Sequence, residues 1–219
     1  MRRMLFEKYR NGIWISHLDL MRVFQRAFRR AGLPLQHTQG YNPHAFVSIA
    51  LPLSVGTASR CELLEFELVN GGEATEALPE RLNCVLPAGV RCLEAYEGGK
   101  KLKELAYLRV RVELEYDGGV PADAVDQLCA LFLRDSLPVE KKSKNGMTVQ
   151  DIKPMIRSLE VLQEDDWTAC LEAVICAQNP ALNPDLLAKV IRTYLPELAP
   201  DFAKSMRLEL YDREGAVFR

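Results

Sequence analysis

All three histidines of the chain lie within residues 16–53, a stretch that also contains its most basic helix. His17 follows Ser16 at the expected start of that helix, where free backbone N–H groups attract anions. An imidazole in this position could bind phosphate, act as a general acid or base, or only take part in the helix cap. His17 is therefore the candidate catalytic residue if the chain has one.

The same helix is expected to carry four arginines on its polar side: Arg22, Arg26, Arg29 and Arg30. Side chains with this spacing can follow a phosphate backbone, meet an acidic protein face, or simply form a solvated helix surface. Residues 1–60 contain nine Lys and Arg against two Asp and Glu, a formal charge of +7, whereas the other 159 residues carry −9. This asymmetry favours an anionic partner for the N-terminal part.

A loop is expected at residues 39–44, because its Gly, Asn and Pro are typical of turns. Tyr41 and His44 could stack on a base, as aromatic side chains do in proteins that bind single strands, with Asn42 beside them. Tyr41 could equally pack against Pro43. We count the loop among the candidate RNA or partner contacts.

A metal site made by His17, His37 and His44 would require the fold to bring them together, and their spacing does not predict this. The six cysteines are scattered and include no C-x-x-C pair: Cys61, Cys84, Cys92, Cys129, Cys170 and Cys176. The sequence also contains no P-loop, no G-x-G-x-x-G, no G-x-S-x-G and no C-x-x-x-C-x-x-C. We expect no metal and no cofactor in this chain, and a binding protein rather than an autonomous enzyme.

A second basic group surrounds the Asn145-Gly146 dipeptide, which favours a hairpin turn. Its members are Lys141, Lys142, Lys144, Lys153 and Arg157. These side chains could extend the anion-binding surface, although lysines at a hairpin tip often serve only against edge-to-edge aggregation.

Six elements are expected before residue 98. Ser16 with Asp19 starts the helix and Gly32 ends it, and Asn11-Gly12 predicts a hairpin turn after the first strand. Apolar periodicity predicts, in order, a strand at 4–9, a helix at 17–31, strands at 46–51 and 60–68, a helix at 73–86 and a strand at 90–96.

The second half repeats this order. The expected elements are a strand at 107–116, a helix at 121–133, a hairpin of 139–143 with 148–152, strands at 157–163 and 167–177, a helix at 184–194 and a strand at 206–211. The fold class is therefore α+β, read as two tandem ferredoxin-like βαββαβ modules at 1–97 and 105–219. One α+β domain with a long mixed sheet is the alternative.

No apolar run approaches the roughly 20 residues that a membrane-spanning helix needs. The first residues meet Glu7, Lys8 and Arg10 before any apolar core of a signal peptide develops. We therefore expect a cytoplasmic protein without a membrane partner.

Two blocks of the sequence carry a family resemblance. The first comprises S-H-L-D-L-M-R from Ser16, R-A-x-R-R-A-G-L-P, Q-G-Y-N-P-H and A-L-P-L-x-V-G; the second, V-x-D-I-K-P-M-I-R-S-L, spans 149–159. Together they resemble the bacterial radical SAM-linked proteins, domain of unknown function 2344, whose members are found beside or fused to a radical SAM protein. The chain departs from the family at Ala45-Phe46, where a basic or polar residue is usual after Asn-Pro-His.

The resemblance implies a radical SAM partner and brings no established catalytic residues. Together with the positive charge of residues 1–60, it leads us to expect an accessory protein that binds RNA, such as tRNA or rRNA, for modification by that partner. Two alternatives remain: an RNA-processing or RNA-modifying enzyme that uses His17, and a protein-interaction module that docks on the radical SAM protein without nucleic acid.

Overall fold

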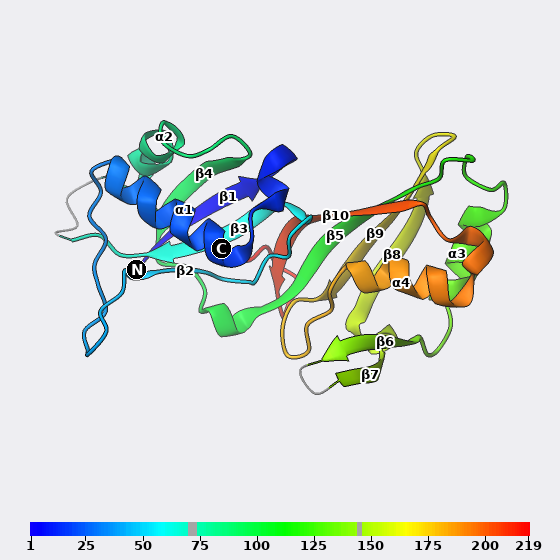
Figure 1. Ribbon diagram of the computed structural model, residues 1–219. Coiled ribbons are helices and arrows are strands. Elements are labelled where there is room, and N and C mark those ends of the chain that lie inside the picture. Colours follow the sequence, from blue (N-terminus) through cyan, green and yellow to red (C-terminus); the bar gives the residue numbers. More distant parts are fainter. Residues whose placement is uncertain (70–73, 144–145) are drawn as a thin grey trace. The chain divides into compact units, whose positions relative to one another are not determined.

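The computed structural model describes residues 1–69, 74–143 and 146–219, and the chain has an α+β fold. It divides into two compact units (Figure 1). Unit 1 comprises Met1–Lys103 with Arg219, and unit 2 comprises Glu104–Phe218. Asn145, half of the dipeptide expected to turn a hairpin, lies outside the described residues.

Unit 1 contains, in chain order, β1 (Arg2–Lys8), α1 (His17–Arg30), β2 (Val47–Ile49), β3 (Ala58–Phe66), α2 (Leu78–Asn83) and β4 (Val90–Glu97). Its strands are antiparallel in the order β4-β1-β3-β2. Met4 of β1 lies opposite Leu64 on one side and Ala95 on the other, and all three side chains belong to one buried cluster with α1 and α2.

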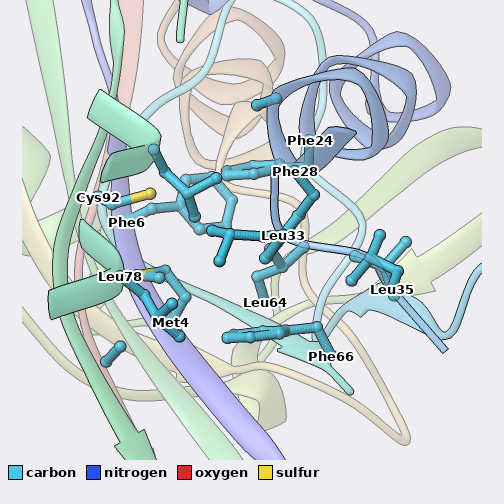
Figure 2. Packing of buried hydrophobic residues seen from close by; sticks show 14 of the residues in the cluster. Met4, Phe6, Phe24, Phe28, Leu33, Leu35, Leu64, Phe66, Leu78 and Cys92 are labelled. Carbon is cyan, nitrogen blue, oxygen red and sulfur yellow. The ribbon is translucent and has the colours of Figure 1, made fainter. Parts of the chain in front are cut away.

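The helix α1 is held at its N-terminus and along one face. The Ser16 hydroxyl accepts a hydrogen bond from the Asp19 N–H at 3.2 Å, which confirms the expected cap. Phe24 packs edge-on against Phe6 at 4.8 Å, and Phe28 lies 4.9 Å from Phe66, so the helix is pinned to β1 and β3 (Figure 2). The opposite face of α1, with its arginines, is left exposed.

The prediction of a hairpin turn at Asn11-Gly12 is wrong, because Arg10–Trp14 form a 3-10 helix. The Tyr9 N–H donates to the Gly89 carbonyl at 2.9 Å, and a Cβ on Gly12 would lie only 2.1 Å from that oxygen. Glycine is needed here for close backbone approach rather than for a turn between strands. The helix expected at 73–86 is also shorter, with a 3-10 turn at Thr75–Ala77 before α2.

Unit 2 contains β5 (Leu105–Glu115), α3 (Ala124–Phe132), β6 (Pro138–Ser143), β7 (Gly146–Asp151), β8 (Ile156–Gln163), β9 (Thr168–Cys176), α4 (Asp185–Tyr194) and β10 (Phe202–Asp212). Its antiparallel sheet has the order β10-β5-β9-β8, and β6 pairs with β7 as a separate hairpin. The helix α3 lies against β8, and α4 lies against β5 and β10 (Figure 1). Val110, Leu128 and Leu187 are among the fully buried side chains.

Short 3-10 turns also occur at Leu102–Glu104, Lys153–Met155 and Pro196–Leu198. Pro184 is the N-cap of α4 rather than its first residue, and Asn183 Oδ1 accepts the Asp185 N–H at 3.2 Å. No helix in the described part of the chain is both long and apolar enough to span a membrane.

Candidate functional site

One hollow of unit 1 lies between the C-terminal half of α1 and the segment that follows it. This cavity, of about 500 Å³, is lined by residues from 25 to 45, and we call it the α1 pocket. It brings Arg29 of α1 together with His37 and His44, which flank the loop at 39–44. Phe28, a buried side chain of α1, also lines it.

Backbone and side-chain hydrogen bonds shape the loop that carries the two histidines. His37 and Ala45 form an isolated β-bridge, and the Thr38 N–H donates to the His44 carbonyl at 2.8 Å. The His44 N–H donates to the Thr38 hydroxyl at 3.2 Å, and Nδ1 of the same imidazole lies 3.1 Å from that hydroxyl. These contacts join the two ends of a short protruding loop, with His37 opposite Ala45 and His44 opposite Thr38.

Tyr41 and Asn42 are exposed on this protruding loop. The Tyr41 side chain has a relative exposure of 107%, so no neighbouring group shields its ring. An aromatic ring held in solvent by a short loop is suited to stacking on a flat partner.

The four arginines of α1 differ in what lies beside them. Arg22 pairs with Asp19 at 2.8 Å, where both side chains are exposed. The hydroxyl of Ser16 and the guanidinium of Arg22 together lower the pKa of Asp19. Arg26 and Arg30 border a smaller hollow of about 250 Å³ with residues 85–87.

Arg29 lines the α1 pocket, and its guanidinium makes no ion pair or hydrogen bond within the described part of the chain. Arg30 Nη1 donates to the Val85 carbonyl at 3.4 Å. Arg29 therefore lines one hollow, Arg26 and Arg30 line another, and Arg22 lines neither of the two.

His17 does not join the α1 pocket. It is the first residue of α1, and the rise of 1.5 Å per residue separates it from Arg29 by roughly 18 Å along the helix axis. Its side chain is half-buried, and its Nδ1 is buried without a hydrogen-bond partner among the described residues. Residues 1–69, 74–143 and 146–219 contain no group of three or more His, Cys, Asp or Glu that could hold a metal ion.

The expected basic group of unit 2 is only partly described. Lys153 Nζ donates to the Phe132 carbonyl at the end of α3 at 2.5 Å, and the Arg157 guanidinium lies 4.7 Å from the centre of the Tyr107 ring. Both line a hollow of about 230 Å³. Lys141 is half-buried. The side chain of Lys142 and the whole of Lys144 lie outside the described residues.

Two arginines of the unit 2 sheet are not among the basic residues that the sequence singles out. Arg109 pairs with Glu172 at 2.6 Å, and hydrogen bonding to that carboxylate raises the pKa of Arg109. Arg111 lies 3.4 Å from both Glu113 and Glu172 and also pairs with Glu164. Charged residues occupy every second position of β5 from Arg109 to Glu115. This pattern is a signal for such pairing, because alternate residues of a strand share a face.

Burial makes several of the cysteines poor nucleophiles. It raises the pKa of the Cys92 thiol to about 12 and also raises the pKa values of Cys170 and Cys176. Because the thiolate is the reactive form, these three thiols are protonated and unreactive near neutral pH.

No curated protein matches the chain. Among solved structures, the crystal structure of a Cbf5-Nop10-Gar1 complex has a chain with a TM-score of 0.54 and 9% identity, covering 95% of this chain and 48% of that one. The archaeal box H/ACA sRNP Nop10-Cbf5 complex has a chain with a TM-score of 0.47 and 10% identity, covering 94% of this chain and 46% of that one. The protein thus spans about half the length of these two chains.

The first of these likenesses concerns the fold alone, given its low identity, and the second is too distant for any inference. The sequence itself is more specific. A family described as uncharacterized protein conserved in bacteria, DUF2344, matches residues 2–184, and the chain belongs to this family.

Proposed function

We propose that this protein is an accessory RNA-binding protein that presents RNA to a radical SAM enzyme. The observation that carries the proposal is the exposed face of α1, where Arg26, Arg29 and Arg30 form no ion pair with a carboxylate within the described residues. Cations that no carboxylate neutralises can pair with phosphates and release their counterions, which is the main source of affinity for nucleic acids. The exposed Tyr41 ring adds a surface on which a base can stack.

The arrangement of strands supports a finer view of the fold, in which each unit is a ferredoxin-like module. In unit 1 the third strand of the βαββαβ order lies between the first and second, and the fourth lies beyond the first. Unit 2 has the same order once the hairpin β6-β7 is set aside as an insertion. The radical SAM partner is inferred from the resemblance of residues 16–56 and 149–159 to radical SAM-linked proteins.

RNA binding is tested with the double variant Arg26→Glu/Arg30→Glu and a fluorescently labelled single-stranded RNA, using fluorescence anisotropy at several salt concentrations. Two reversed charges should weaken binding by tenfold or more and reduce the slope of log K against log salt by about 2. The matched control is Arg60→Glu/Arg91→Glu, which changes the same charge at two other exposed arginines of unit 1. Equal salt-dependent affinities of both double variants and the wild type would contradict the proposal.

A protein-docking function without RNA is the second candidate. Trp14, just before α1, and Leu18, in its first turn, are exposed by 67% and 68%. Exposed apolar side chains near each other in the chain can form part of a protein contact surface. A tagged protein recovered from cell lysate with a radical SAM protein, both before and after nuclease treatment, would favour this candidate if no RNA is present. In that case Trp14→Ser/Leu18→Ser should abolish recovery, and the arginine reversals should not.

A further inference from the structure

The α1 pocket has the size and mixed chemistry of a small-molecule site. Its volume of about 500 Å³ lies within the usual range for ligand pockets of roughly 300–1,000 Å³. Arg29, His37 and His44 supply polar groups, while Phe28, Leu33 and other apolar side chains supply the remainder of the lining. A purely apolar ligand would leave the polar groups without partners, and a purely ionic ligand would make no use of the apolar lining.

The polar part of the pocket favours an anion. None of the described residues that line the pocket is acidic. The Arg29 guanidinium is exposed and has no partner in the described chain, so its five N–H donors remain available to a ligand. A planar guanidinium matches the oxygens of a phosphate in a bidentate arrangement, which makes phosphate a well-suited anion here.

The two imidazoles are positioned by the loop rather than by the ligand. His44 Nδ1 lies 3.1 Å from the Thr38 hydroxyl and 3.4 Å from the Asn42 carbonyl oxygen. That nitrogen is therefore engaged within the loop, and Nε2 is the ring nitrogen available to a ligand. His37 is held at the backbone by its bridge to Ala45, and both histidine side chains are exposed.

The apolar part of the pocket favours a flat ring. Phe28 is fully buried, with its ring against Phe66, while Leu33 and Leu35 are buried within the same core cluster. Figure 2 shows Phe28 and Leu33 inside this cluster and Leu35 at its edge. All three line the pocket, and we call them its apolar floor. The exposed imidazoles of the same lining can stack on a nucleobase. A phosphate alone would not fill a pocket of about 500 Å³ that is lined in part by apolar side chains.

We propose that the α1 pocket binds one nucleoside monophosphate unit, with its phosphate at Arg29 and His44 and its base beside the imidazoles and the apolar floor. This deepens the proposed function, on which it rests: the nucleotide is an unstacked residue or a terminus of the bound RNA. The same chemistry could also come from a free nucleotide. The two sources differ in whether the rest of α1 contributes to binding.

The first experiment titrates the full chain with AMP, CMP, GMP and UMP by isothermal calorimetry, with inorganic phosphate as a second probe. At least one nucleotide should bind more tightly than inorganic phosphate by tenfold or more, because the base adds stacking. Arg29→Gln and His44→Ala should each weaken the binding of that nucleotide by tenfold or more. Arg60→Gln, at an exposed arginine of unit 1 that lies outside both α1 and the pocket lining, is the matched control and should leave the nucleotide affinity unchanged.

Equal affinities for phosphate and all four nucleotides, or an unchanged affinity in Arg29→Gln and His44→Ala, would overturn the pocket assignment. Circular dichroism of both variants checks the fold, and Arg29 and His44 are exposed, so neither change removes core packing. Should His44→Ala disturb the loop, Arg29→Gln alone decides.

The second experiment separates this proposal from the function on which it rests. It measures single-stranded RNA binding in Arg29→Gln and in Arg26→Glu/Arg30→Glu, with and without the tightest nucleotide as competitor. If an RNA residue occupies the pocket, the nucleotide should compete with RNA, and both variants should bind RNA more weakly.

Nucleotide binding without RNA binding would support the pocket as a site for free nucleotides and refute the proposed function. RNA binding that neither Arg29→Gln nor the competitor affects would refute the pocket alone.

Discussion

Arg111 of unit 2 and Arg29 of unit 1 differ in the groups that lie beside them. Arg111 of unit 2 is surrounded by the carboxylates of Glu113, Glu164 and Glu172 within the described structure. Arg29 of unit 1 is exposed on α1 and has no acidic partner in the described chain. A neutralised arginine has little attraction left for a phosphate, since its own carboxylates repel the ligand. The number of arginines therefore does not define an anion-binding surface; their neighbours do.

The largest expected effect on stability comes from weakening the packing of α1, the helix that carries Arg29. Phe24→Ala deletes a fully buried ring that packs against Phe6, and it should lower the free energy of unfolding by about 3–5 kcal/mol. Urea unfolding is followed by tryptophan fluorescence in a Trp167→Phe background, so that Trp14 of unit 1 is the only reporter. Phe46→Ala, at a partly exposed ring of the same unit, should cost far less. Equal losses would mean that α1 is not anchored by its apolar face.

The next effect concerns the close backbone contact near the start of α1. Gly89 has φ +90°, and a Cβ there would lie 2.5 Å from the Gly12 nitrogen. Gly89→Ala should cost about 1–2 kcal/mol for the left-handed backbone and about 1–3 kcal/mol more for overpacking. Gly98→Ala isolates the first contribution, since Gly98 has φ +82° and a Cβ there would have no heavy atom within 4 Å. The midpoint of thermal unfolding should therefore be lower for Gly89→Ala than for Gly98→Ala.

A smaller effect compares the two kinds of arginine directly. Arg111→Ala leaves three carboxylates without their shared cation and should cost about 1 kcal/mol, while Arg29→Ala should stay within about 0.5 kcal/mol of the wild type. Urea unfolding at low salt and in 1 M NaCl measures both. The cost of Arg111→Ala should shrink in high salt because the charges are screened. Arg29→Ala costing as much as Arg111→Ala would show that Arg29 has a structural partner.

The smallest effect uses pH to separate ion pairing from hydrogen bonding. The pKa of Asp19 is below its ordinary value of 3.8 because of Ser16 and Arg22. Backbone N–H groups of Leu137 and Lys153 lower the pKa of Asp151 from the same value. A carboxyl whose folded pKa is lowered stabilises the fold above its ordinary pKa and loses that contribution as pH falls through the folded pKa.

Asp19→Asn and Asp151→Asn should therefore lower the urea midpoint slightly at pH 7, and each difference from the wild type should close as the pH falls below the ordinary carboxyl pKa of 3.8. High salt at pH 7 should reduce the Asp19→Asn effect more than the Asp151→Asn effect, because only Asp19 owes part of its shift to a cation. A difference that persists at low pH would assign the loss to the amide itself rather than to the charge.

Local features of the fold could be predicted from the sequence because their causes lie within a few residues. Ser16 and Asp19 define the start of α1, and its apolar spacing identifies the buried face. The order of strands and helices follows from alternation and turn residues, with ends displaced by a few positions. The turn at Asn11-Gly12 could not be predicted, since the backbone of Gly89, far along the chain, decides the local conformation.

The sequence by itself determined that α1 is a two-faced helix with exposed arginines, that the N-terminal part is basic, and that the chain resembles a bacterial family. Only the tertiary structure decided which of those groups meet. It placed His37 and His44 beside Arg29 and left His17 at the other end of the helix. It also surrounded Arg111 with carboxylates up to 61 residues away. Helix periodicity orients a side chain, but the packing of distant segments chooses its neighbours, and those neighbours determine whether a charge is free to bind.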